Sequence, residues 1–159
     1  MSTFRPGLYV VATPIGNLGD ISPRALQVLG TATLIAAEDT RTSAKLVHMA
    51  NGTGRLVSLT EHNVNARIPE LLAKASEGVV ALVSDAGTPV IADPGARLVD
   101  AAHDADMTVV AIPGPSALAA AVSVSGFSGE DVHFLGFLPK PKAERKTRLL
   151  KAAVNAAVL

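Results

Sequence analysis

The chain has 159 residues, of which 48% are hydrophobic and only 3% aromatic, so its core must be built from aliphatic side chains. It contains no cysteine, which excludes disulfides, thiolate metal sites and a cysteine nucleophile. The 14 basic and 14 acidic residues balance, but six of the basic ones lie in 140–151 and leave residues 1–139 with a net charge of −5. Only the end of the chain therefore suits a polyanion, although such a basic run is more often simply a solvated helix face.

Three kinds of sequence signal are missing. No apolar stretch is long enough to span a bilayer, and the N-terminus lacks the pattern of a signal peptide. The four histidines show no paired spacing of metal ligands. We therefore expect a cytoplasmic protein with no membrane partner and no metal.

Strand-like and helix-like segments alternate five times in the first four fifths of the chain. The first strand ends in a Pro- and Gly-containing loop, and Ser22-Pro23 then provides an N-cap and a proline at the first position of a helix. The predicted strands cover 7–12, 33–37, 56–59, 79–83 and 107–112, and the predicted helices cover 23–29, 43–49, 65–75, 95–105 and 116–125. This pattern is typical of an α/β fold, a mostly parallel five-stranded sheet with helices on both faces.

The character of the sequence changes after Gly126. Residues 127–131 have the composition of a linker, 132–138 predict a new strand, and the basic stretch predicts a helix from about residue 143. The chain ends in apolar residues without a closing cap. We therefore expect an N-terminal α/β domain over 1–126 that forms one wall of a cleft. Residues 127–159 are expected to be the linker and opening strand and helix of a truncated second α/β domain.

All five strands of the alternating part end in polar or Gly- and Pro-containing residues. In a parallel sheet these ends lie on one rim, where open α/β sheets bind their ligands. The most prominent loop follows the strand 79–83 and reads Ser-Asp-Ala-Gly-Thr-Pro over 84–89. No glycine-rich phosphate motif is present, and loops rich in proline offer few N–H donors. An adenosine-like ligand between backbone groups and apolar walls fits such a rim better than a triphosphate.

Four segments of the rim, taken together, resemble the tetrapyrrole methylase superfamily: 9–22, 37–41, 83–89 and 112–117. They are most similar to the branch that methylates a cytidine 2′-hydroxyl of small-subunit ribosomal RNA. The resemblance implies a two-domain, homodimeric methyltransferase with S-adenosylmethionine as cofactor in the cleft between its domains. It also implies the small ribosomal subunit or its RNA as partner.

The resemblance further implies which residues bind the cofactor. They lie in three loops and are Pro14, Ile15, Asp85, Ala86, Gly87, Thr88, Ile91, Ser116 and Ala117. Two places depart from the superfamily pattern. The usual G-x-G-P-G of the first loop is replaced over 12–16, and the usual Gly-Asp-Pro is Gly-Thr-Pro over 87–89. The second change removes a carboxylate, for which Asp85 is the candidate replacement.

The catalytic candidates come from the charged residues of the rim. A ribose hydroxyl is a weak nucleophile that a base or hydrogen-bond acceptor would assist, and an arginine can grip a phosphate bidentately. The candidates are Asp39, Arg41, Glu61 and His62, with Glu38 beside them. The alternative roles are pairing of Glu38 or Asp39 with Arg41 and capping of a helix by Glu61. Two other functions stay open, a tetrapyrrole methyltransferase and a non-catalytic nucleotide-binding module.

Overall fold

The computed structural model describes residues 4–91, 93, 95–130, 132–153 and 157–158. The chain divides into two compact units, 1–115 and 116–159. The sequence suggested a boundary after Gly126, and the difference is helix α5 (Ala117–Ser125), none of whose residues is buried.

The first unit is built on a five-stranded sheet in which every pair of neighbouring strands is parallel. The strands are β1 (Gly7–Val11), β2 (Leu34–Ala37), β3 (Arg55–Ser58), β4 (Val79–Val83) and β5 (Val109–Ile112), in the order β3-β2-β4-β1-β5. The predicted α/β fold with a parallel sheet is confirmed. Strands β2 and β4 are buried along their whole length, as their uninterrupted apolar sequences predict.

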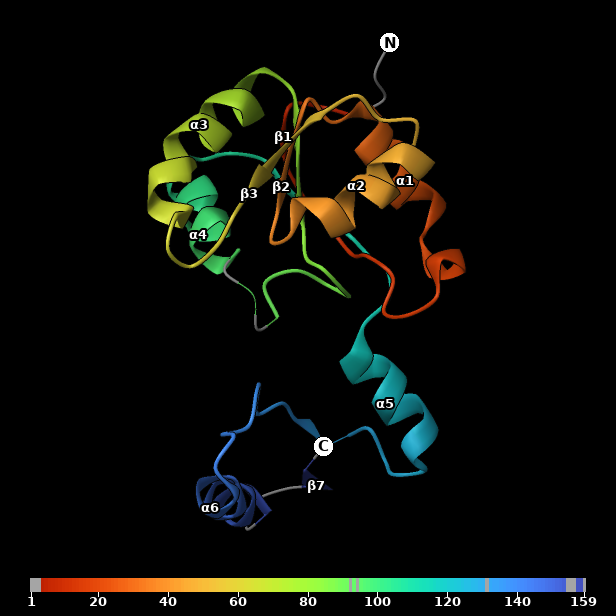
Figure 1. Ribbon diagram of the computed structural model, residues 1–159, viewed down its shortest axis with the longest axis vertical. Helices are drawn as coiled ribbons and strands as arrows, with labels where there is room; N and C mark the ends of the chain where they lie inside the picture. Colours follow the sequence, from red (N-terminus) through yellow and green to blue (C-terminus); the bar gives the residue numbers. More distant parts are fainter. Residues whose placement is uncertain (1–3, 92, 94, 131, 154–156, 159) are drawn as a thin grey trace. The chain divides into compact units, whose positions relative to one another are not determined.

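Two pairs of helices cover the two faces of this sheet (Figure 1). Helices α1 (Pro23–Thr31) and α2 (Thr40–Met49) pack on the face that carries Tyr9, Ile35 and Ala81. Helices α3 (Val64–Glu77) and α4 (Ala96–Asp104) pack on the face that carries Leu8, Leu34 and Val80. Alternate residues of each strand thus enter two separate aliphatic cores.

Local sequence explains where these helices begin. The Ser22 hydroxyl accepts a hydrogen bond from the N–H of Ala25 at the start of α1, as predicted. Helix α2 begins at Thr40, three residues earlier than expected, because the carboxylate of Asp39 caps it. Helix α3 begins after Asn63 rather than at the predicted cap Asn65.

The strand order places the loops after β1 and β4 at a switch point of the sheet. Strands β1 and β4 are neighbours, yet the chain leaves β1 toward β2 and leaves β4 toward β5, in opposite directions across the sheet. A crevice outside the carboxyl ends of such a strand pair is where open α/β sheets bind their ligands. The fold therefore predicts a ligand site at the residues that follow Val11 and Val83.

The second unit contains α5, the short parallel pair β6 (Val132–His133) and β7 (Ala157–Val158), and helix α6 (Lys142–Ala153). The predicted strand over 132–138 was wrong beyond its first two residues. Gly136 has a φ of +66°, which ends the extended conformation. In addition, the guanidinium of Arg148 donates hydrogen bonds to the carbonyls of Leu135 and Phe137. Those carbonyls are therefore bonded to α6 rather than to a neighbouring strand.

Candidate functional site

The loops after β1 and β4 are joined by a pair of backbone hydrogen bonds. The N–H of Thr13 donates to the carbonyl of Gly87 over 2.8 Å, and the N–H of Gly87 donates to the carbonyl of Thr13 over 3.1 Å. The buried hydroxyl of Thr13 lies 3.2 Å from the carbonyl oxygen of Ser84 and 3.3 Å from that of Gly87. These bonds fix the two loops on either side of the switch point.

Further bonds connect the remaining strand ends to this pair. The Thr88 hydroxyl donates to the carbonyl of Pro115 after β5 over 3.1 Å. The N–H of Asp39, after β2, donates to a carboxylate oxygen of Asp85 over 3.0 Å. The Ser58 hydroxyl at the end of β3 reaches the carbonyl of Glu38 over 3.4 Å. All five strand ends thus form one connected rim, with the loop after β4 at its centre, as predicted from the sequence.

Gly87 is needed in this arrangement for its conformation and for its lack of a side chain. Its φ is +84°, a region that residues with a Cβ adopt only at a cost. A Cβ built there would lie 3.3 Å from the Ile15 side chain and 3.8 Å from the carbonyl of Pro115. The loops after β1 and β5 therefore approach the loop after β4 closely at this residue.

The strained backbone continues three residues further along the same loop. Val90 has a φ of +76°, which is rare for a β-branched residue. Such conformations cost about 1–3 kcal/mol and cluster at ligand sites, where the surrounding structure holds them. Strain therefore occurs in the loop that forms the centre of the rim.

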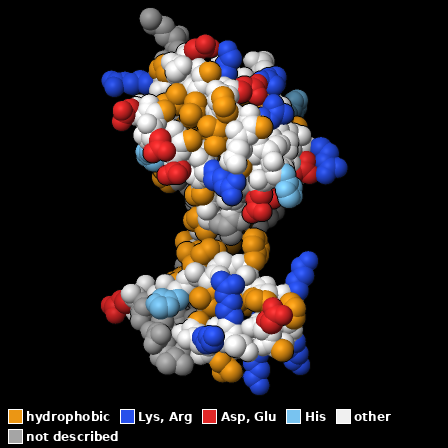
Figure 2. Space-filling model, turned by 90° about the vertical axis from the view of Figure 1, so that its left-hand side faces the viewer, with side chains coloured by type: hydrophobic (Ala, Val, Ile, Leu, Met, Phe, Trp, Pro, Cys, Tyr) orange, Lys and Arg blue, Asp and Glu red, His pale blue; other side chains and the backbone are white. Residues whose placement is uncertain are grey.

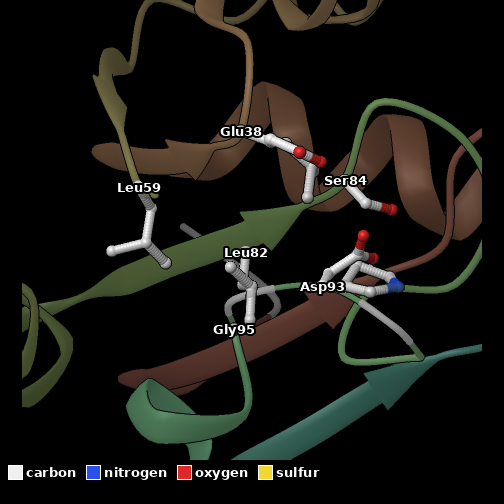
Figure 3. Close-up of a pocket in the computed structure, with 8 residues that line it drawn as sticks. Glu38, Leu59, Leu82, Ser84, Asp93 and Gly95 are labelled. Carbon is white, nitrogen blue, oxygen red and sulfur yellow. The ribbon is translucent and has the colours of Figure 1, made fainter. Parts of the chain in front are cut away.

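A small pocket opens beside the loop after β4 (Figure 3). Its cavity volume is about 10 Å³, enough for roughly one water molecule and far below the ~300 Å³ at which sites for whole small molecules begin. In Figure 3 the oxygen atoms of Ser84 and Asp93 face one another, and Leu82 and Leu59 line the apolar side. Glu38 from the end of β2 completes the lining. The pocket itself has room for about one water molecule, so it marks where polar side chains converge beside the loop.

The electrostatics of this pocket are dominated by carboxylates. Partial burial raises the pKa of Glu38 above its ordinary value, and the negative charges of Asp85, Asp93 and Asp39 raise it further. Burial also raises the pKa of Asp93, and a hydrogen bond from Ser84 opposes that shift. This end of the rim therefore favours a positively charged or hydrogen-donating group.

Asp39 and Arg41 form an ion pair at the start of α2. The guanidinium of Arg41 donates to Asp39 from Nη2 over 2.6 Å and from Nε over 3.0 Å, and the backbone N–H of Arg41 donates to the same carboxylate over 2.8 Å. These hydrogen bonds lower the pKa of Asp39 to about 2. The pair is therefore lost only as the pH falls toward that value. The alternative role for Asp39, pairing with Arg41, is what the structure shows.

Glu61 and His62 lie in the turn between β3 and α3, and both are exposed. The N-cap position of α3 is occupied by Asn63 rather than Glu61. The side chain of Asn63 holds the preceding turn instead, because it accepts from the N–H of Thr60 and donates to the carbonyl of Ser58. Arg41 is also free to reach solvent, with 89% of its side chain exposed. The four catalytic candidates thus lie on the rim, and three of them are open to a large substrate.

The cofactor candidates of the first unit gather around Gly87. Ile15 and Ile91 leave 37% and 42% of their surface exposed, which supplies apolar contact area on the rim. Ser116 and Ala117 stand at the N-cap and first residue of α5, directly after Pro115. Sequence reasoning missed Thr13 and Asp93 as parts of the site. The available signals were a threonine immediately after a buried strand and the second carboxylate of the loop 84–95.

Two negative findings hold for the part of the chain that the structure describes. No helix there combines the length and apolar character required to cross a bilayer. No group of three or more histidine or carboxylate side chains there could hold a metal ion.

Together, the parallel sheet and the connected rim define an open α/β domain of the kind that binds ligands at the carboxyl ends of its strands. The family model of the tetrapyrrole (corrin/porphyrin) methylases matches residues 7–159. The chain therefore belongs to the tetrapyrrole methylase family, and the resemblance noted in the sequence is confirmed.

Similar curated proteins from several bacteria share one name. The chain is 49% identical over 151 residues to ribosomal RNA small subunit methyltransferase I of Neisseria meningitidis serogroup B, covering 94% of the chain and 52% of the relative. It is 47% identical over 143 residues to the protein of the same name from Escherichia coli O157:H7, covering 89% and 50%. The chain spans about half the length of the curated relatives that it matches.

Solved structures of more distant relatives share the fold. The chain matches uroporphyrin-III-C-methyltransferase from Thermus thermophilus with a TM-score of 0.59 at 25% identity, over 78% of the chain and 53% of that structure. It matches a conserved hypothetical protein from Aeropyrum pernix K1 with a TM-score of 0.64 at 26% identity, over 80% and 45%. These likenesses agree with the α/β architecture described above.

Proposed function

We propose that the chain is part of an S-adenosylmethionine-dependent methyltransferase that acts on the 2′-hydroxyl of a cytidine in small-subunit ribosomal RNA. The observation that carries the proposal is the hydrogen-bonded rim, in which the loop after β4 joins the loops after β1, β2 and β5. The names of relatives at 47–49% identity support the RNA substrate. A cytoplasmic location and a homodimer belong to the same proposal.

The residues of the rim fit the proposed cofactor. The loops after β1, β4 and β5 converge at Gly87, and the exposed Ile15 and Ile91 offer apolar walls for an adenosine. The carboxylates near the pocket suit a sulfonium cation, which supplies an electrophilic methyl group when the cofactor is bound. The residues that would hold it are Pro14, Ile15, Asp85, Ala86, Gly87, Thr88, Ile91, Ser116 and Ala117.

The chain's own contribution to the reaction is orientation. Displacement at a methyl group requires the hydroxyl oxygen in line with the bond that breaks, so a fixed rim lowers the entropic part of the barrier. Arg41, held by Asp39, would fix a phosphate of the RNA next to the target nucleotide. With its pKa of about 2, Asp39 is a weak proton acceptor and suits this holding role. Glu61 and His62 remain candidates for contact with the RNA or for the base.

The first experiment is a calorimetric titration of the chain with S-adenosylmethionine, with NADH as the control ligand. We expect the methyl donor to bind and NADH not to bind, because the rim lacks a dinucleotide phosphate motif. Binding of NADH alone would exclude a methyltransferase. Binding of neither ligand would show that this rim does not form the cofactor site by itself.

Replacing Arg41 with alanine should weaken binding of small ribosomal subunits and leave the affinity for S-adenosylmethionine unchanged. The reason is that its guanidinium lies at the exposed end of the rim and pairs only with Asp39 among the described residues. Arg55→Ala is the matched control, since Arg55 also pairs with a carboxylate, Glu70, but at the start of β3 on the opposite edge of the sheet. Equal loss of both ligands in Arg41→Ala would contradict the phosphate-binding role.

Replacing Glu38 with glutamine should reduce the preference for S-adenosylmethionine over S-adenosylhomocysteine roughly two- to thirtyfold. This is the range that Coulomb's law gives for a carboxylate and a sulfonium ~8 Å apart, between the dielectric constant of water and that of a protein surface. Only the methyl donor carries the sulfonium charge that the Glu38 carboxylate favours. The wild-type preference should also fall as the pH drops through the raised pKa of Glu38. Calorimetry with both ligands measures the effect, with Glu77→Gln as the control at the opposite edge. An unchanged ratio would remove Glu38 from the cofactor site.

A tetrapyrrole substrate is the second candidate, because uroporphyrin-III-C-methyltransferase shares the fold. The curated relatives at nearly twice that identity favour RNA. A competition experiment separates the two candidates. If the substrate is RNA, small ribosomal subunits should bind and a uroporphyrinogen should not displace them, whereas displacement would favour the tetrapyrrole.

A further inference from the structure

The basic residues of 140–151 play two different roles, because the arginines are hydrogen-bonded within the second unit and the lysines are not. Arg145 donates to the carbonyl of Lys140 over 3.3 Å, and Arg148 donates to those of Leu135 and Phe137 over 2.5 and 3.4 Å. These two arginines hold the loop 134–141 against α6 and are structural. The lysine side chains are exposed, and none of them forms an ion pair or side-chain hydrogen bond with the described residues of the second unit.

The free lysines are not evenly distributed around the helix. Lys142 and Lys146 are four residues apart, so they lie on one face of α6, and Lys140 precedes them in the loop. Glu144, the acidic residue of α6, lies on the other side of the helix, nearer Lys151. We call Lys140, Lys142 and Lys146 the lysine face. Because no carboxylate of α6 shares it, this face keeps its positive charge.

The second unit also carries exposed aromatic side chains. Phe127, Phe134 and Phe137 are 71%, 51% and 84% exposed, and they are three of the four phenylalanines in the chain. Phe137 lies in the very loop that Arg148 holds by its carbonyl. Large apolar side chains of this kind are seldom left in water without a partner. In Figure 2 the smaller body, the second unit, likewise shows Lys and Arg side chains among exposed hydrophobic ones.

We propose that the lysine face and Phe137 form a binding surface for single-stranded RNA, with the lysines on phosphates and the phenyl ring stacked on an unpaired base. Charge complementarity selects a polyanion, because residues 140–151 carry six cations and one carboxylate while residues 1–139 are net negative. The exposed aromatic ring selects a single strand, since bases within a duplex offer no free face for stacking. The identity of this RNA as ribosomal rests on the proposed function, whereas the surface itself does not.

The test measures fluorescence anisotropy of a short labelled single-stranded RNA with the whole chain, between about 50 and 200 mM salt. Wild type should bind, and its affinity should fall as salt rises. Each lysine on a phosphate contributes about 0.7 to the slope of log affinity against log salt, or about fivefold in affinity near 0.1 M. Lys142→Gln with Lys146→Gln should therefore lose about 25-fold and lower the slope by about 1.4. The matched control is Lys74→Gln with Lys151→Gln, which removes the same charge and should change the affinity less than fivefold.

Phe137 provides an independent readout. Phe137→Leu should lose about tenfold in affinity at an unchanged salt slope, because leucine keeps the apolar surface but cannot stack, and Phe137→Tyr should restore binding. Full binding by Phe137→Leu would overturn the base-stacking role and favour an apolar protein partner instead. Equal losses in the two lysine double variants would overturn the lysine face, as would tighter binding to duplex than to single-stranded RNA.

The same chain separates this proposal from the proposed function. Calorimetry with S-adenosylmethionine reports on the rim of the first unit, which these variants leave intact. Retained cofactor binding without any RNA binding would overturn the surface alone. RNA binding without cofactor binding would support the surface and would show that the rim of the first unit does not form the cofactor site by itself.

Discussion

Thr13→Val is expected to lower the free energy of unfolding of the first unit by about 1–2 kcal/mol and to weaken S-adenosylmethionine binding by up to about tenfold. The hydroxyl of Thr13 is fully buried and lies within hydrogen-bonding distance of two carbonyl oxygens of the loop after β4. Valine keeps the shape but leaves the carbonyl of Ser84 without this donor. Because the same loop carries five of the proposed cofactor residues, lost stability and lost affinity should appear together.

Chemical denaturation and calorimetry of the same preparations measure the two quantities. Thr13→Ser is the matched control, since it keeps the hydroxyl and loses only a methyl group. We expect serine to bind the cofactor like wild type at a modest cost in stability. If valine and serine weaken binding equally, the hydrogen bond has no special role and any change of the Thr13 side chain disturbs the loop. If valine binds normally, the β1–β4 bridge is not part of the cofactor site.

The sequence was sufficient to predict the five strands and their common rim because these depend on short, buried, β-branched runs. Each predicted strand of the first unit overlaps an observed one, and the loop 84–89 lies at the centre of the rim as expected. A buried parallel strand leaves little ambiguity, since no polar residue can occupy either face. Gly87 was a candidate through the family resemblance, and its positive φ and close approach to Ile15 now explain why a glycine lies there.

Other features depend on partners that periodicity does not reveal. The run 132–138 is as apolar as a strand, but Gly136 and the guanidinium of Arg148 turn its backbone toward α6. Asp39 was a catalytic candidate by its place after β2, and the structure shows that it also caps α2 and holds Arg41. Such roles depend on which donor lies nearest in space. A carboxylate on a rim therefore has to be assigned from its contacts.

Gly87→Ala should destabilise the first unit by about 1–2 kcal/mol and abolish detectable cofactor binding in the same titration. A φ of +84° is unfavourable for alanine, and the new Cβ would lie 3.3 Å from Ile15, which must move by a few tenths of an ångström. That movement acts on a proposed cofactor residue directly. The backbone of the loop after β4 and the side chain of Ile15 would therefore both be displaced.

Gly126→Ala isolates the conformational part of this effect. Gly126 ends α5 with a φ of +74°, and nothing lies within 4 Å of a Cβ built there. It should therefore show similar strain in thermal unfolding and bind S-adenosylmethionine like wild type. Retained binding in Gly87→Ala would mean that the cofactor does not contact the loop after β4. Loss of binding in both variants would mean that backbone strain anywhere in the chain is enough, and the close approach of Gly87 to Ile15 would lose its special role.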